Sequence, residues 1–132
     1  MKRRPGELPA TSPGQCILIV EDEMLLAMML EDMLTDLGYC VVKAARVTKA
    51  TDLAATAAID CAILDVNLGG ETSYPVAKEL HRRGIPFVFS TGYGAAGLRP
   101  EYHGSPILSK PYSLKDLQRV LAKALGPRAS KM

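Results

Sequence analysis

Short apolar runs alternate along the chain with longer segments in which apolar residues recur every three or four positions. The runs are typical of buried parallel strands, and the periodic segments are typical of amphipathic helices. Strands are predicted at 16–20, 39–42, 61–64, 86–90 and 105–108. Helices are predicted at 23–37, 48–58, 74–83 and 113–126. The first helix should bury one stripe of apolar side chains, namely Leu26, Met29, Leu30, Met33 and Leu37.

The alternation of strands and helices predicts a doubly wound α/β fold, a five-stranded parallel sheet with helices on both faces. The glycine-rich segment 92–105 should form only a short or irregular fourth helix. One domain is expected at 16–126, flanked by a disordered leader at 1–15 and a disordered tail at 127–132.

The composition and charge of the chain limit the classes of partner that it can bind. A chain of 132 residues fits one ordinary domain. Between residues 16 and 125 there are 11 basic and 13 acidic side chains, which argues against a nucleic-acid-binding surface. The longest apolar stretch, 24–30, is too short to span a bilayer, and the N-terminus lacks the apolar core of a secretory signal. We therefore expect a cytoplasmic protein with no membrane contact.

Three cysteines, Cys16, Cys40 and Cys61, fall within predicted strands. They are widely spaced, without the paired spacing of a zinc site. The sequence predicts reduced, buried thiols that act as small apolar groups in a reducing cytoplasm.

Polar residues follow four of the predicted strands: Glu21-Asp22, Asp65, Ser90-Thr91 and Lys110-Pro111. In a parallel sheet these strand ends lie on one edge, where ligand sites of α/β folds form. Clustered carboxylates repel one another unless a cation or a proton lies among them. The sequence thus predicts a divalent-metal site with one reactive acid, suited to phosphoryl chemistry.

Each group alone also has an ordinary interpretation. The acids after the first strand could stabilise a helix N-terminus, and Asp65 or Thr91 could serve in turns. Lys110 could be an exposed surface lysine. Their joint placement after the first, third, fourth and fifth strands favours a site.

The residues 17–23, 63–68, 89–92 and 108–112 read ILIVEDE, ILDVNL, FSTG and LSKPY. Taken together, these motifs resemble the receiver domain of two-component response regulators over residues 15–126. The resemblance implies a flavodoxin-like sheet with strand order 2-1-3-4-5.

The resemblance also implies a magnesium site. Asp22 would be a direct ligand of Mg²⁺, and Glu21 would act mostly through metal-bound water. Asp65 would complete the carboxylate set, and Asn67 would offer its backbone carbonyl.

Asp65 corresponds to the phosphoryl acceptor of the family. Thr91 would hydrogen-bond the phosphoryl group, and Lys110 would pair with the acceptor carboxylate and later with a phosphoryl oxygen. Positioning and charge stabilisation would supply most of the catalysis.

Several positions depart from the common family pattern. Ile107 stands where most members have a switch aromatic, and Gly69 replaces the usual proline after the acceptor. With its FSTG motif, the chain is similar to single-domain regulators that carry Phe-Ala-Thr-Gly and lack the switch aromatic. Segment 92–105 should therefore carry the conformational change. Tyr93 would either shield the phosphoryl group or lie exposed in its loop.

The leading expectation is a stand-alone, non-enzymatic phosphoacceptor, monomeric or weakly dimeric. It would be phosphorylated by a histidine kinase or a phosphotransfer protein and act by protein contact, as a relay or as a phosphate sink. The alternatives are a metal-dependent phosphatase, against which Asn67 argues because a general acid is often needed there, and a receiver fold used only for docking.

Overall fold

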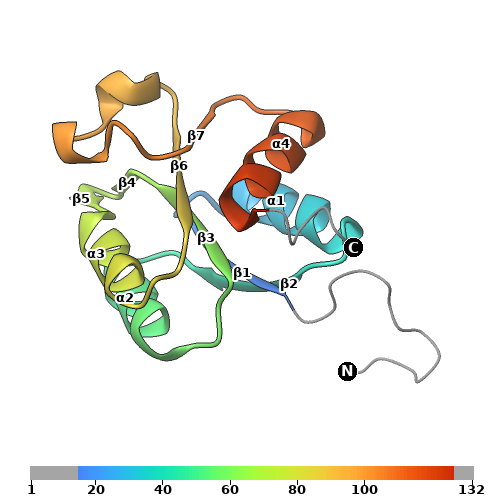
Figure 1. Ribbon diagram of the computed structural model, residues 1–132, viewed down its shortest axis with the longest axis horizontal. Helices are drawn as coiled ribbons and strands as arrows, with labels where there is room; N and C mark the ends of the chain where they lie inside the picture. The colour runs from blue at the N-terminus through green and yellow to red at the C-terminus, as the bar shows by residue number, and fades with distance from the viewer. Residues whose placement is uncertain (1–14, 127–132) are drawn as a thin grey trace.

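A five-stranded parallel sheet forms the middle layer of this computed structural model, which describes residues 15–126 (Figure 1). The predicted tail and nearly all of the predicted leader lie outside the described residues. The strand order is β2-β1-β3-β6-β7, which confirms the doubly wound fold and the order 2-1-3-4-5. The strands are β1 (Cys16–Val20), β2 (Cys40–Ala44), β3 (Cys61–Asp65), β6 (Phe87–Thr91) and β7 (Ile107–Ser109).

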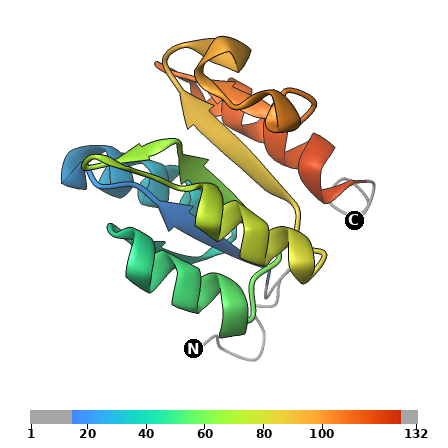
Figure 2. The same cartoon turned by 90° about the vertical axis from the view of Figure 1, so that its left-hand side faces the viewer.

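Helices cover both faces of the sheet (Figures 1 and 2). One face carries α1 (Met24–Asp36) and α4 (Leu114–Leu125), and the other carries α2 (Val47–Thr56) and α3 (Tyr74–Arg82). A reciprocal capping box between Ser113 and Asp116 starts α4. Within residues 15–126, no helix is long and apolar enough to cross a membrane.

The central strands are apolar throughout because both of their faces are buried. In β1, Ile17 and Ile19 pack toward α1 and α4, whereas Leu18 and Val20 pack toward α2 and α3. All four side chains are at most 1% exposed. This two-sided burial produces the continuous apolar run in the sequence.

Helix α1 is rotated relative to the predicted stripe. Its buried residues are Ala27, Leu30 and Leu34, and Met29 is 49% exposed, so the prediction for Met29 was wrong. Residues 24–30 are apolar on every side, and such a pattern does not determine which side packs on the sheet. The rotation leaves an exposed surface on α1, here termed the α1 apolar surface, formed by Met24, Leu25, Met28 and Met29.

Two short 3-10 helices, η2 (Gly94–Gly97) and η3 (Pro100–Tyr102), replace a fourth crossover helix, as the glycine pattern predicted. The η3 helix is anchored by Tyr102, whose ring stacks on Tyr74 at 5.1 Å and meets Phe89 edge-on at 5.2 Å. Aromatic packing therefore fixes the far end of this connection to the core.

The segment after β3 is more ordered than the predicted loop. It forms a small antiparallel hairpin of β4 (Asn67–Leu68) and β5 (Glu71–Thr72). Gly69 and Gly70 make the turn with φ values of 55° and 94°. Hairpin turns of two residues favour positive φ at both positions, which glycine adopts without steric cost.

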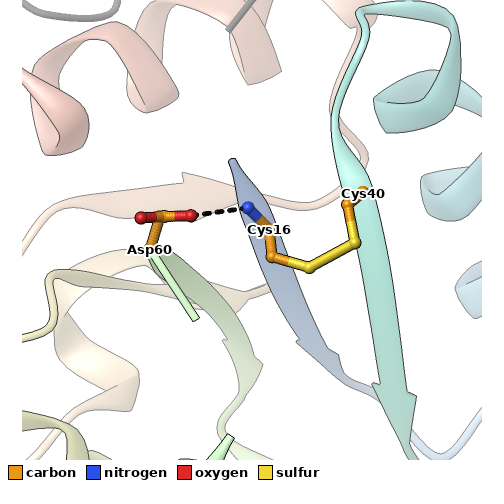
Figure 3. The surroundings of a disulfide bond; sticks show 3 residues. All are labelled: Cys16, Cys40 and Asp60. Atoms are coloured by element: carbon orange, nitrogen blue, oxygen red, sulfur yellow. Dashed lines mark hydrogen bonds between the residues drawn. A yellow bond between two sulfur atoms is a disulfide. The ribbon is translucent and has the colours of Figure 1, made fainter. Parts of the chain in front are cut away.

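The prediction of three reduced cysteines was wrong for two of them, because a disulfide joins Cys16 and Cys40 (Figure 3). These residues are direct register partners on β1 and β2, with Cα atoms 4.4 Å apart. Their pairing depends on strand register, which sequence spacing does not reveal. Cys61 is free and buried, as predicted, and burial raises the pKa of its thiol to about 12.

Candidate functional site

Three carboxylates converge at the carboxyl edge of the sheet. Glu21 and Asp22 follow β1, and Asp65 is the last residue of the neighbouring strand β3. One carboxylate oxygen from each lies within 4.8 Å of the others. The structure thus brings together the acids that the sequence placed after two different strands.

Lys110 reaches the same place from beyond β7. Its Nζ lies 3.3 Å from Oδ1 of Asp65, to which it donates a hydrogen bond, and 3.5 Å from Oε1 of Glu21. The backbone N–H of Lys110 donates to the carbonyl of Thr91, which ties the lysine to the end of β6. The lysine, which follows the edge strand β7, therefore links Glu21 after β1 to Asp65 at the end of β3.

Burial dominates the electrostatics of the two inner acids. The side chains of Glu21 and Asp65 are 5% and 13% exposed. Loss of water raises the pKa of both carboxyls; for Glu21 the Glu23 N–H opposes this rise, and for Asp65 the Lys110 ammonium opposes it. For Lys110, burial alone would lower the pKa, but Asp65 and Glu21 together raise it overall.

The donor set fits a hard divalent cation. Three carboxylates facing one ammonium leave two negative charges without a partner inside the cluster, which equals the charge of Mg²⁺. Carboxylate oxygens, completed by water, are the ligands that Mg²⁺ prefers. Glu21, Asp22 and Asp65 would hold the ion. Asn67 opens β4 two residues after Asp65, and the role of its carbonyl stays a prediction.

Thr91 ends β6, and its hydroxyl bonds to the backbone of the loop that follows. Its Oγ1 accepts a hydrogen bond from the backbone N–H of Tyr93 at 3.0 Å. Among residues 15–126, no hydrogen bond joins the Thr91 hydroxyl to Asp65 or to Lys110. The Tyr93 ring is 77% exposed, so this structure shows the exposed alternative of the two that the sequence left open.

Two nearby residues were assigned no role from the sequence. Tyr112 packs against the core beside α4, and its pKa is raised to about 12, first by burial and then by the charges of Glu21 and Asp65. Ser90 is the register partner of Asp65 and is 2% exposed, and its hydroxyl has no hydrogen-bond partner among the residues that the structure describes. The available sequence signals were the polar residues inside the FSTG and KPY motifs.

A cavity of about 700 Å³ adjoins the cluster between the starts of α1 and α2. It is lined by Glu21 and Asp22 on one side and by Lys43, Arg46 and Met24 around them. Two of the three acids, Glu21 and Asp22, therefore line a cavity at this edge.

Comparison with known proteins decides the family. The profile described as "Response regulator receiver domain" matches residues 17–122 of this chain. The chain belongs to this family. The resemblance rested on the sequence motifs that hold Glu21, Asp22, Asp65 and Lys110, and the structure of this receiver domain shows the strand order that the resemblance implied.

Solved receiver domains share the fold. The solution structure of SdrG from Sphingomonas melonis Fr1 is 44% identical, has a TM-score of 0.77 and covers 88% of this chain and 99% of its own. The receiver domain of sensor histidine kinase PA1611 from Pseudomonas aeruginosa PAO1, with a magnesium ion coordinated in its active site cleft, is 30% identical. Its TM-score is 0.76, with 86% of this chain and 98% of its own covered.

Among curated proteins, the phyllosphere-induced regulator PhyR of Methylorubrum extorquens is 33% identical over 116 residues. The match covers 83% of this chain and 43% of PhyR. The chain spans just under half the length of the curated relatives that it matches.

Proposed function

We propose that this receiver domain is a single-domain response regulator that accepts a phosphoryl group on Asp65. The donor is a phosphohistidine of a histidine kinase or a phosphotransfer protein. The observation that carries the proposal is the convergence of Asp65 with Glu21, Asp22 and Lys110 at one sheet edge.

In the proposed transfer, a carboxylate oxygen of Asp65 attacks phosphorus. The P–N bond to the histidine ring of the donor breaks, and the ring nitrogen leaves with the electron pair. The product is an aspartyl phosphate. When bound, Mg²⁺ supplies positive charge that reduces the repulsion between the acceptor and the incoming anion.

The residues of this chain divide the remaining work. Lys110 already contacts Asp65 at 3.3 Å and would follow the developing charge onto a phosphoryl oxygen. The Thr91 hydroxyl would leave Tyr93 and donate to another phosphoryl oxygen. Catalysis in this scheme is positioning and charge stabilisation, with no turnover of an external substrate, so we propose that the protein is not an enzyme.

Two further observations support a protein partner. The α1 apolar surface begins two residues after Asp22, and Met24 lines the same cavity as the acids. Exposed apolar patches of this kind are typical of protein contact sites. We place this phosphotransfer in the cytoplasm, with output through protein contact, relay or phosphate storage.

Mass spectrometry after incubation with acetyl phosphate and Mg²⁺ tests the proposal. The wild-type protein should gain the mass of one phosphoryl group, and the gain should disappear in Asp65→Asn. Asp60→Asn is the matched control, because Asp60 lies just before β3 at the opposite end of that strand. Full labelling of Asp65→Asn would reject Asp65 as the acceptor.

The alternatives predict different results with small phosphate compounds. A metal-dependent phosphatase would hydrolyse small phosphate esters with repeated turnover. A docking-only receiver fold would gain no mass under any donor concentration. The contact between the Asp65 carboxylate and Lys110 at the acidic cluster favours the phosphoacceptor over both.

A further inference from the structure

The end of β6 and the 3-10 helix η2 meet at one very close approach, between Thr91 and Gly97. A Cβ atom placed on Gly97 would lie 2.8 Å from Oγ1 of Thr91 and 3.1 Å from Cβ of Tyr93. Real Cβ atoms essentially never come within 3.0 Å of such a neighbour. Gly97 is not in the left-handed region, so space, not backbone conformation, requires glycine here.

The absent side chain at position 97 leaves room for the Thr91 hydroxyl. Threonine has three staggered positions on Cβ, which its Oγ1, its Cγ2 and a hydrogen share. Here Oγ1 faces Gly97 and accepts the N–H of Tyr93 at 3.0 Å. If residue 97 carried a methyl group, only the hydrogen would fit that position, and the hydroxyl would have to leave Tyr93.

We propose that Gly97 is a positioning residue that keeps the Thr91 hydroxyl bonded to the Tyr93 N–H in the unphosphorylated protein. The proposal deepens the function proposed above and rests on it. A phosphoryl group on Asp65 would draw the hydroxyl toward its anionic oxygens. The Tyr93 N–H then loses its acceptor, and η2 loses the contact between Gly97 and Thr91 that holds it against the end of β6.

The rest of the connection limits how far this release spreads. Leu98 is 5% exposed, and the backbone N–H of Arg99 donates to the Tyr74 hydroxyl at 2.9 Å. Beyond them, Tyr102 is stacked on Tyr74. The mobile part is thus confined to residues 93–97, between the end of β6 and the anchor at Leu98.

Coupling between two sites is reciprocal. If phosphorylation at Asp65 frees η2, then weakening the seat by substitution favours the arrangement adopted after phosphorylation. Gly97→Ala should therefore act in the unmodified protein as a partial mimic of phosphorylation.

The test compares Gly97→Ala with Gly104→Ala, a matched control in the same connection where an added Cβ meets nothing within 4 Å. In Gly97→Ala without phosphodonor, the amide NMR signals of residues 93–97 should move toward their positions in wild-type protein treated with Mg²⁺ and beryllofluoride. Labelling by acetyl phosphate should be several-fold faster than in Gly104→Ala, which should match the wild type.

A double-mutant cycle assigns the effect to the hydroxyl. In a Thr91→Ala background, Gly97→Ala should lose most of its effect on the amide signals, because Oγ1 is gone. An equal effect in both backgrounds, or a Gly97→Ala spectrum and labelling rate matching those of Gly104→Ala, would overturn the proposal.

A wild-type measurement covers the case in which Gly97→Ala does not fold. Beryllofluoride with Mg²⁺ should speed hydrogen exchange at the Tyr93 amide, because that N–H loses the Thr91 hydroxyl as its acceptor. Unchanged exchange there would reject the proposed role of Gly97 and Thr91. If Asp65 is labelled normally but Gly97→Ala changes neither the amide signals nor the labelling rate, only the role of Gly97 is rejected. Full labelling of Asp65→Asn would instead reject the phosphoacceptor, while the contact in the unmodified protein would remain testable.

Discussion

Replacing Asp22 by asparagine should stabilise the metal-free protein. The substitution keeps the size of the side chain and removes one of three clustered charges. At 4.8 Å, a pair of like charges costs about 1 kcal/mol with the screening of bulk water and about 3.5 kcal/mol at an effective dielectric constant of 20. Asp22 is exposed, so the lower figure applies to its pairs with Glu21 and Asp65.

At the 4.8 Å limit, two such pairs give a gain of about 2 kcal/mol, and added salt reduces it. For a domain of this size, a gain of 1 to 2 kcal/mol raises the melting temperature by about 4 to 8 °C. Differential scanning calorimetry in EDTA at low ionic strength measures this directly.

Magnesium should reverse the order of the two proteins. At a free Mg²⁺ concentration 100 times the dissociation constant, binding adds about 2.7 kcal/mol to the wild-type unfolding free energy. Asp22→Asn lacks a ligand and should gain far less. Calorimetry repeated across a magnesium titration follows the crossing point.

Asp32→Asn is the control, because Asp32 is an exposed carboxylate on α1 outside the cluster. Its unfolding free energy should stay within about 0.5 kcal/mol of the wild type. The reasoning fails if Asp22→Asn is less stable than the wild type in EDTA, or if both proteins gain equally from Mg²⁺.

Two other predictions concern pH and redox conditions. Because burial raises the pKa of Asp65 and Glu21, the folded state binds protons more tightly than the unfolded one. In EDTA, the contribution of Asp65 to stability should be complete below pH about 4 and be lost as pH rises through the raised pKa. The denaturant midpoint of the wild type minus that of Asp65→Asn should therefore fall as the pH is raised from 4 to 7. A difference that rises with pH would contradict the burial argument. Separately, the Cys16–Cys40 disulfide closes a loop between residues 24 positions apart, so reduction should lower the unfolding free energy by about 3 kcal/mol. A phosphine reductant should lower the urea midpoint of the wild type and leave that of Cys40→Ser unchanged. Identical wild-type midpoints with and without the reductant would refute the crosslink.

The site shows how far sequence reasoning reached. Glu21, Asp22, Asp65 and Lys110 were each placed after a strand, and parallel strands end at a common edge, so their convergence was predictable. The direction of the Thr91 hydroxyl was not, because it depends on contact with Gly97, which lies in another element. Tyr112 was missed for the same reason, since its nearness to Glu21 and Asp65 is visible only after folding.

The sequence by itself determined the strands, their order along the chain and the polar residues that end them. These features follow from local rules: two-sided burial makes a strand apolar, and glycine and proline interrupt helices. Only the tertiary structure decided which side of α1 faces the sheet, that Cys16 pairs with Cys40, and that Gly97 seats Thr91. Each of these depends on the register and packing of elements distant in the chain, which a local pattern does not encode.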